Sequence, residues 1–342
     1  MPPGPWHHWR MPFDFDAAVA APFRMQPGLR RLAAGTAQLT PLSPGSSHQR
    51  EKLAVLSAFW PQALLSSDDF DAKPALQAVC AQAAAEHPTA WQWDGQRAHA
   101  LRLGTAVTDG GTVEQTASGN FGLGDEVVRC LNGLPPNWRL SGLLSLAFAE
   151  DLAIVDGRSG RIPWLAVALP SHWAPELKVG RHFAEVHAQV ADNTLLVGAA
   201  DSLTRLVCGD QRWERFVWTL TDHPRLHAHP ARTAPERWAN TPVQNAWFRS
   251  EHQTFIPLPA LQQAVFTIHV QVQPLVDVID SAARAQALHD AVRTMSPQVL
   301  AYRGLAAVRA PLLRWLTEGS LDGLAQRPPS TGATVTPPLP AV

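Results

Sequence analysis

Lysine is scarce in this chain of 342 residues. The only lysines are Lys52, Lys73 and Lys178, and the basic and acidic residues balance to a net charge of −1. No block of basic residues occurs, whereas a protein that binds nucleic acid independently of its sequence needs many cationic contacts to phosphates. The composition therefore argues against nucleic acid as a partner.

Cysteine and long apolar segments are also scarce. Cys80, Cys130 and Cys208 lie far apart, and no Cys-x-x-Cys pair occurs. This pattern suggests neither a disulfide framework nor a zinc ribbon, and three thiolates are too few for an ordinary iron–sulfur centre. The apolar stretch 143–155 contains two carboxylates and is too short to span a bilayer. Because residues 1–10 also lack a signal-peptide core, we expect a cytoplasmic, reduced protein that has no membrane partner.

Hydrophobic residues make up 46% of the chain, enough for the core of one large or two modest domains. Periodicity and capping signals predict helices at 49–58 and 72–86, and a strand or loop at 88–104. Beyond residue 140 the predicted helices are 143–150, 178–190, 281–294 and 298–316, and the predicted strands are 152–155, 162–169, 195–197 and 215–220, followed by a hairpin at 247–273.

Strands dominate between residues 150 and 273, with helices before, between and after them. This order indicates an α+β fold built on an antiparallel sheet. Residues 1–140 are expected to be an N-terminal helical and irregular elaboration that packs on a core formed by residues 141–320. Residues 326–342 contain little that could be buried, so we expect a disordered tail there.

The predicted hairpin carries the most informative polar pattern. Arg249, Glu251 and Gln253 alternate along its first strand and therefore point to one face. The second strand presents an apolar face made of Phe266, Ile268, Val270 and Val272. A cation, a carboxylate and an amide in one row can orient a polar ligand over a pocket, and a solvated strand face is the alternative.

A histidine on the predicted helix 178–190 is the main candidate for a metal ligand. His187 lies close to an apolar stripe made of Val179, Phe183, Val186 and Val190. It is either a hydrogen-bonded core histidine or a neutral imidazole held for a metal such as haem iron. Lys178 and nearby arginines would then pair with the haem propionates. His182, nearer the edge of the stripe, ranks second as a ligand.

A second histidine group comprises His223, His227 and His229. Two or three histidines can bind zinc, but the surrounding prolines favour a surface loop.

Several motifs in the same order resemble the family of the haem-dependent oxidative N-demethylase catalytic subunit. The resemblance covers about residues 20–315 and rests on Pro-Phe-Arg-Met at 22–25, Glu-Asp-Leu at 150–152, Leu-Pro-Ser-His-Trp at 169–173, Glu-Leu-Lys-Val-Gly at 176–180, Val-His at 186–187, Arg-Phe-Val-Trp at 215–218 and Arg-Ser-Glu-His-Gln-Thr at 249–254.

The resemblance implies a PAS-like core that binds haem b, with His187 as the iron ligand and Lys178 and Arg215 beside the cofactor. It also implies that haem and O2 oxidise a methyl group of a small secondary amine, releasing formaldehyde, with electrons from a partner reductase that carries flavin and iron–sulfur groups. Glu251 would hold the protonated amine, and Arg249 and Gln253 would complete the catalytic row.

The chain departs from the family pattern at three places close to the predicted site. His252 stands where an arginine is expected, another arginine is expected near His269, and Ala-Gln-Val follows His187 in place of a proline-containing run. These departures are compatible with a different substrate or with loss of the reaction. Two other functions therefore stay open: a haem-based gas or redox sensor without turnover, and a cofactor-free PAS-like interaction module.

Overall fold

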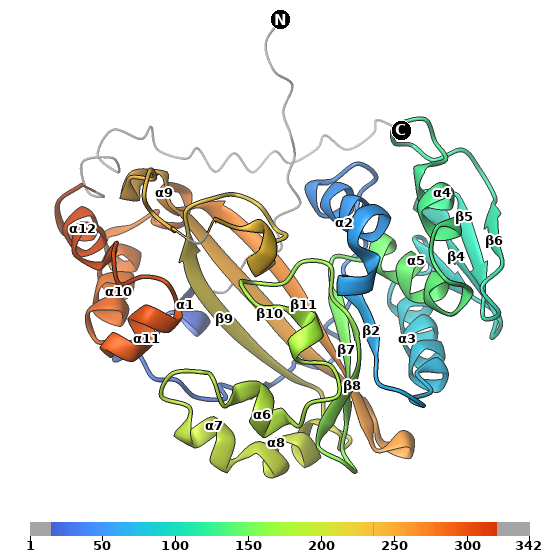
Figure 1. Ribbon diagram of the computed structural model, residues 1–342, viewed down its shortest axis with the longest axis horizontal. Helices are drawn as coiled ribbons and strands as arrows, with labels where there is room; N and C mark the ends of the chain where they lie inside the picture. The colour runs from blue at the N-terminus through green and yellow to red at the C-terminus, as the bar shows by residue number, and fades with distance from the viewer. Residues whose placement is uncertain (1–14, 235, 320–342) are drawn as a thin grey trace, which may run out of the picture.

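The structure is a computed structural model that describes residues 15–234 and 236–319. Its architecture is α+β with two antiparallel sheets, as the sequence predicts (Figure 1). The larger sheet has the strand order β1 (Arg30–Arg31), β9 (Trp213–Thr221), β10 (Trp247–Leu258), β11 (Gln263–Pro274), β7 (Asp151–Asp156), β8 (Arg161–Ala166) and β2 (Leu64–Ser66). The smaller sheet consists of β3 (Trp91–Trp93), β4 (Arg97–Ala100), β5 (Thr105–Thr108) and β6 (Val113–Gln115).

Helices surround both sheets. α2 (Ser47–Ala63), α3 (Lys73–Glu86), α4 (Glu126–Asn132) and α5 (Arg139–Ala147) lie on the side of the smaller sheet, while α6 (Phe183–His187), α7 (Thr194–Gly198) and α8 (Ala200–Val207) lie together beside the long strands (Figure 1). The elements α1 (Phe15–Ala18), α9 (Leu275–Val278), α10 (Ala282–Arg293), α11 (Pro297–Tyr302) and α12 (Arg309–Arg314) share a hydrophobic cluster with β9 and β10. None of the helices in the described ranges combines the length and the hydrophobicity that a bilayer crossing requires.

Local chemistry explains several helix starts. The Ser46 hydroxyl accepts a hydrogen bond from the Gln49 amide at the start of α2, and Ser281 and Ser296 cap α10 and α11 in the same way. α3 begins with Lys73-Pro74, and proline in the first turn lacks only an amide proton that would have no helical partner.

The predicted hairpin is confirmed as β10 and β11. Glu251 pairs with Val270 in β11 and with Val217 in β9, and Gln253 pairs with Arg215. Directly paired residues of an antiparallel sheet project to the same face. The polar row of β10 and the apolar row of β11 therefore share one face of the large sheet.

The predicted helix 178–190 is wrong in its extent, because only Phe183–His187 is helical. Gly180 has a φ of 72°, in the left-handed region, and its amide donates to the carbonyl of Ile162. The Ile162 amide in turn donates to Arg181, and His182 forms a bridge with Arg161. Pairing with β8 and the left-handed turn at Gly180 therefore keep residues 180–182 out of a helix, which a sequence period does not reveal.

Two other predicted elements also differ from the structure. The short strand expected at 195–197 is helix α7, in which Leu195 and Val197 are exposed and only Leu196 is buried. The helix expected at 298–316 divides into α11 and α12, because Gly304 adopts a φ of 65° between them. The tail expected at 326–342 lies outside the described residues.

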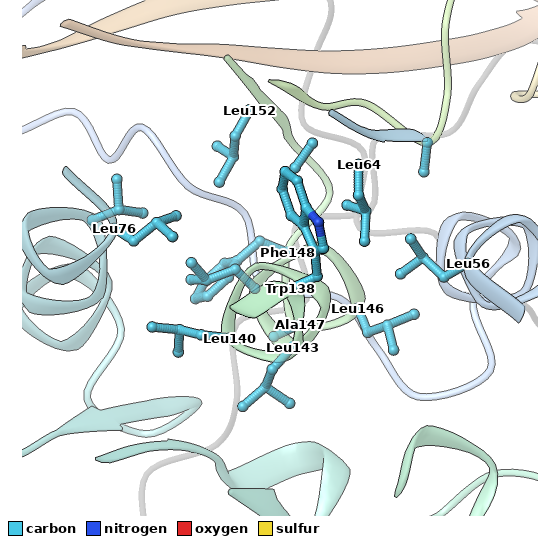
Figure 2. Packing of buried hydrophobic residues seen from close by; sticks show 14 of the residues in the cluster. Leu56, Leu64, Leu76, Trp138, Leu140, Leu143, Leu146, Ala147, Phe148 and Leu152 are labelled. Atoms are coloured by element: carbon cyan, nitrogen blue, oxygen red, sulfur yellow. The ribbon is translucent and has the colours of Figure 1, made fainter. Parts of the chain in front are cut away.

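The largest hydrophobic cluster joins the two sheets through α5. Residues 140–147 of this helix are all buried. Figure 2 shows Leu140 pointing to the side of Leu76, Leu146 to the side of Leu56, and Leu143 in a third direction away from both. The same cluster includes Trp91 of the smaller sheet and Val265 of the larger one. The two sheets thus share one core.

Candidate functional site

The candidate site lies on the face of the large sheet that carries the polar row. Gln253 Nε2 donates to Glu251 Oε2, and Arg215 lies opposite Gln253 on β9. Glu251 is 8% exposed, so its carboxylate is largely removed from bulk water. The predicted alignment of Arg249, Glu251 and Gln253 on one face is what the register shows.

Arg249 is held in a different way from its two neighbours. It is 1% exposed, and its guanidinium donates to Ser171 Oγ at 2.7 Å, to the Arg225 carbonyl at 3.1 Å and to the Leu226 carbonyl at 2.7 Å, with longer bonds to the carbonyls of Leu169 and Pro170. Burial lowers its pKa to about 10, against the opposing effect of Glu251. Arg249 therefore fastens two loops onto the sheet instead of donating a hydrogen bond to Glu251.

The segment that crosses this face carries His187. Val179 and Val186 pack with Trp173 and Phe266 against Ala153 and its buried neighbours in β8. At the end of α6, His187 Nδ1 donates to the Phe183 carbonyl at 2.8 Å. The two rings also lie 4.1 Å apart between centroids.

The hydrogen bond to Phe183 determines which ring nitrogen of His187 can bind a metal. With the proton on Nδ1, Nε2 keeps its lone pair, and it makes no hydrogen bond to any described residue. Burial lowers the pKa of His187 to about 4, and the charges of Arg215 and Lys178 act in the same direction. The imidazole is therefore neutral near pH 7, which is the form that binds a metal.

Lys178 and Arg215 supply positive charge beside His187. Lys178 Nζ donates to the Val186 carbonyl at 3.0 Å, and burial lowers the pKa of its ammonium group. Burial likewise lowers the pKa of Arg215, whereas Glu251 raises it. The Nε of Arg215 is buried and unpartnered within the described residues. The structure thus brings His187, Lys178, Arg215 and Glu251 into one neighbourhood.

The other histidines suggested by the sequence have different partners. His182 caps α6 through Nδ1, which accepts from the Ala184 amide, and its Nε2 lies 3.4 Å from Asp201 Oδ1. His227 Nδ1 donates to the Ala168 carbonyl, and His229 Nε2 contacts the Glu176 carboxylate. Across residues 15–234 and 236–319, no three His, Cys, Asp or Glu side chains are placed to hold a metal ion.

These side chains fit haem better than a metal site built from protein ligands alone. Haem iron needs as few as one protein ligand, because the porphyrin supplies four nitrogens. His187 offers one neutral imidazole with a free Nε2, and Lys178 and the unpartnered Nε of Arg215 offer cationic donors for propionates.

Two residues of the site were missed from the sequence. Tyr302, the only tyrosine of the chain, and Arg303 follow one another at the end of α11, and both interact electrostatically with Glu251 and Arg215. Arg303 also donates through Nη1 to the Trp218 carbonyl. Both residues lie within the long helix predicted at 298–316, where no local pattern distinguishes them. Only the fact that Tyr302 is the single tyrosine could have drawn attention to this segment.

The two histidines that depart from the family pattern lie on the opposite face of the sheet from Glu251. His252 and His269 pair directly across β10 and β11. His252 Nε2 lies 2.7 Å from Glu214, and His269 Nδ1 lies 3.4 Å from Glu150. Neither replaces a side chain of the polar row.

Comparison with protein families agrees with this geometry. The family model described as "Haem-dependent oxidative N-demethylase, alpha subunit-like" matches residues 75–313. This range covers most of the chain and includes every site residue predicted from the sequence, and the family name implies dependence on haem. The chain therefore belongs to the haem-dependent oxidative N-demethylase, alpha subunit-like family, as the ordered motifs indicated.

Proposed function

We propose that this protein catalyses the haem- and O2-dependent oxidative N-demethylation of a small N-methyl amine. The observation that carries the proposal is the imidazole of His187, whose Nδ1 proton is held by Phe183 and whose Nε2 is left available beside two cations. Family membership supports the reaction class. Electrons would come from a partner reductase carrying flavin and iron–sulfur groups.

The strand order supports a PAS-like core within residues 141–320. The five strands β7 to β11 follow one another along the chain. Across the sheet they lie in the order β8, β7, β11, β10, β9, so that the second strand of the chain is followed by the first, fifth, fourth and third. The helices α6, α7 and α8 connect the second strand to the third. Residues 1–140 would be the elaboration packed on this core, and the three buried free thiols suit the reducing cytoplasm.

His187 Nε2 would hold the iron of haem b, and Lys178 and Arg215 would pair with its propionates. When bound, haem supplies the iron at which O2 is activated. The hydrogen bond from Nδ1 to Phe183 fixes the tautomer and the orientation of the ring, as such partners do for ligating histidines.

Glu251 would bind the amine in its protonated form. Gln253 donates to Oε2 of this carboxylate and thereby orients it, which leaves Oε1 for a charge-assisted bond to the ammonium group. An amine must lose its proton before it can be oxidised, and Glu251 Oε1 would accept that proton. Arg249 keeps the adjoining loops fixed during these steps.

The visible spectrum of the protein after reconstitution with haem tests the proposal. We expect a Soret band at one haem per chain, its loss in His187→Ala, and its retention in the matched variant His99→Ala, which alters a histidine of the smaller sheet. With a chemical or enzymatic reductant, dimethylamine or a related amine should then release formaldehyde. A colourless protein would favour the cofactor-free module, and ligand binding without turnover would favour the sensor.

A further inference from the structure

Two histidines outside the polar row face each other at the end of β9. His172 follows Ser171 in the loop after β8, and His223 lies just beyond Thr221. Their ring centroids are 5.7 Å apart. Nε2 of His172 and both ring nitrogens of His223 are buried and unpartnered within the described part of the chain. Buried polar atoms in folded proteins nearly always have a partner, so three such nitrogens at one place indicate a binding site.

The pair is held in place before any ligand arrives. Arg249 donates to Ser171 in one loop and to the carbonyls of Arg225 and Leu226 in the other, so one guanidinium fastens both histidine-bearing loops. The His172 amide also donates to the Ala228 carbonyl at 2.9 Å. His172 keeps a φ of 62°, a conformation that is uncommon for a residue with a side chain and that clusters at functional sites.

The charges around the pair are mainly positive. Burial lowers the pKa of His172 to about 3, and Arg237 and Arg249 lower it further, whereas Asp222 opposes them. Burial also lowers the pKa of His223, where Asp222 is the largest charge effect and raises the pKa, while Arg249, Arg225 and Arg237 lower it. Both imidazoles are therefore neutral and each keeps one N–H donor. Every hydrogen bond that Arg249 donates goes to an uncharged acceptor, although the charges of Glu251, Glu51 and Asp151 also act on it.

We propose that His172 and His223 form a subsite that binds a carboxylate group. Two neutral N–H donors in a positive potential suit an anion with two oxygens. Thr219, which pairs with Arg249 across the sheet, adds a buried and unpartnered hydroxyl on the same face. The surrounding arginines disfavour a cationic ligand, and no third protein ligand stands near the two imidazoles within the described ranges.

The carboxylate has two possible sources, and both rest on the proposed function. One is a propionate of the porphyrin. The other is the substrate, which would then be an N-methyl amino acid whose ammonium group reaches Glu251. The two positions are close, because Glu251 is two residues from Arg249 along β10 and projects to the same face.

Binding measurements with two pairs of probes separate these sources. The first pair is haemin and haemin dimethyl ester, and the second is sarcosine and its amide. In each pair only the first member carries a free carboxylate. We expect the wild-type protein to bind the acid of at least one pair about tenfold more tightly than its neutral partner, as a charge-assisted hydrogen bond provides.

Two variants test whether the histidine pair causes the preference for the acid over the neutral probe. His223→Phe keeps a ring without nitrogens, and His172→Asn withdraws the imidazole while tolerating the left-handed backbone. Both should reduce the preference for sarcosine to near one and weaken the preference for haemin, to which Lys178 and Arg215 also contribute, whereas the matched control His289→Phe on α10 should retain both preferences. Equal binding of acid and neutral probes by the wild type, or preferences that both variants leave unchanged, overturns the subsite.

A direct readout on the wild-type chain covers the case in which a variant fails to fold. With ¹⁵N-labelled histidine, the imidazole signals of His172 and His223 should shift on addition of sarcosine or metal-free protoporphyrin, and not with the neutral partners. Absence of any shift overturns the subsite. A Soret band without any histidine-dependent preference for an acid probe would leave the proposed function standing alone, and selective sarcosine binding without haem uptake would leave the subsite standing alone.

Discussion

Arg249 shows that a strand pattern can indicate where a side chain points without indicating which partners it binds. The two-residue period placed it beside Glu251, and the structure keeps it there, but its donors go to the loops at 169–171 and 225–226. A strand pattern defines the face to which a side chain points, whereas its partners depend on loops that are distant in sequence.

Arg249→Lys should therefore destabilise the fold and disturb the site. The compact ammonium of lysine has three donors and cannot reproduce the planar fork, which leaves buried carbonyls without partners. We expect the free energy of unfolding to fall by about 2–4 kcal/mol in denaturant titrations. The same change at exposed Arg102 is the control. Equal stabilities of the two variants would contradict the role of Arg249 in fastening the two loops to the sheet.

Glu150 is a buried carboxyl group whose titration should make stability depend on pH. Its carboxylate is 3% exposed, with Oε2 accepting from the Thr40 amide and Oε1 near His269. Burial raises its pKa from 4.5 to about 7. The folded chain therefore keeps this proton more tightly than the unfolded chain. The resulting contribution to stability is complete below pH 4.5 and is lost as the pH rises through 7.

Glu150→Gln should flatten this part of the pH profile. The amide can still accept from Thr40 and can donate to His269, but it does not titrate. The loss of unfolding free energy between pH 5 and pH 8 should shrink by up to about 3 kcal/mol relative to wild type. Glu236→Gln, at an exposed position, controls for the substitution itself. Parallel wild-type and Glu150→Gln profiles would contradict the assignment.

Helices and strands with a clear hydrophobic period in their own sequence were predictable. Those whose conformation depends on contacts with residues distant in sequence were not. The hairpin β10–β11 follows from alternation and a short link, and α10 from its serine cap. The apolar stripe of a predicted helix 178–190 drew attention to His187, but the first part of that segment pairs with β8 and is not helical. What frees Nε2 is the bond to Phe183 within α6. Tyr302 and Arg303 reach the site only through the packing of α11, which no local pattern encodes.

Gly180 forms the turn that precedes α6. Its φ of 72° is strained for any residue with a side chain, and a Cβ there would lie 3.0 Å from Ser67 Oγ. Gly180→Ala should cost about 1–2 kcal/mol and should weaken haem uptake by displacing α6. Gly198 in α7 has no left-handed φ and no atom within 4 Å of a built Cβ. Gly198→Ala should be neutral or stabilising by up to about 1 kcal/mol. Similar effects of both changes on melting and on the Soret band would contradict this account.

In the whole molecule, the two faces of the large sheet have different roles. One face carries the polar row beneath the segment with His187, while the other packs Trp218, Leu220 and Phe248 against α9, α10, α11 and α12. The site thus rests on a sheet that is anchored from behind and joined through α5 to the smaller sheet. Rigid support of this kind is what a site needs to hold its groups in fixed geometry.

The shared core predicts that both sheets unfold together. Leu143 is fully buried in α5, within the cluster that contains Trp91 of β3 and Ile154 of β7 (Figure 2). Leu143→Ala should lower the free energy of unfolding by about 2–5 kcal/mol. Because one cooperative unit has one global opening, hydrogen exchange should accelerate by the same factor in β3–β6 and in β9–β11. Leu195→Ala, at an exposed position of α7, is the matched control. Faster exchange confined to the smaller sheet would show instead that residues 1–140 open as an independent module, with the site-bearing sheet remaining folded.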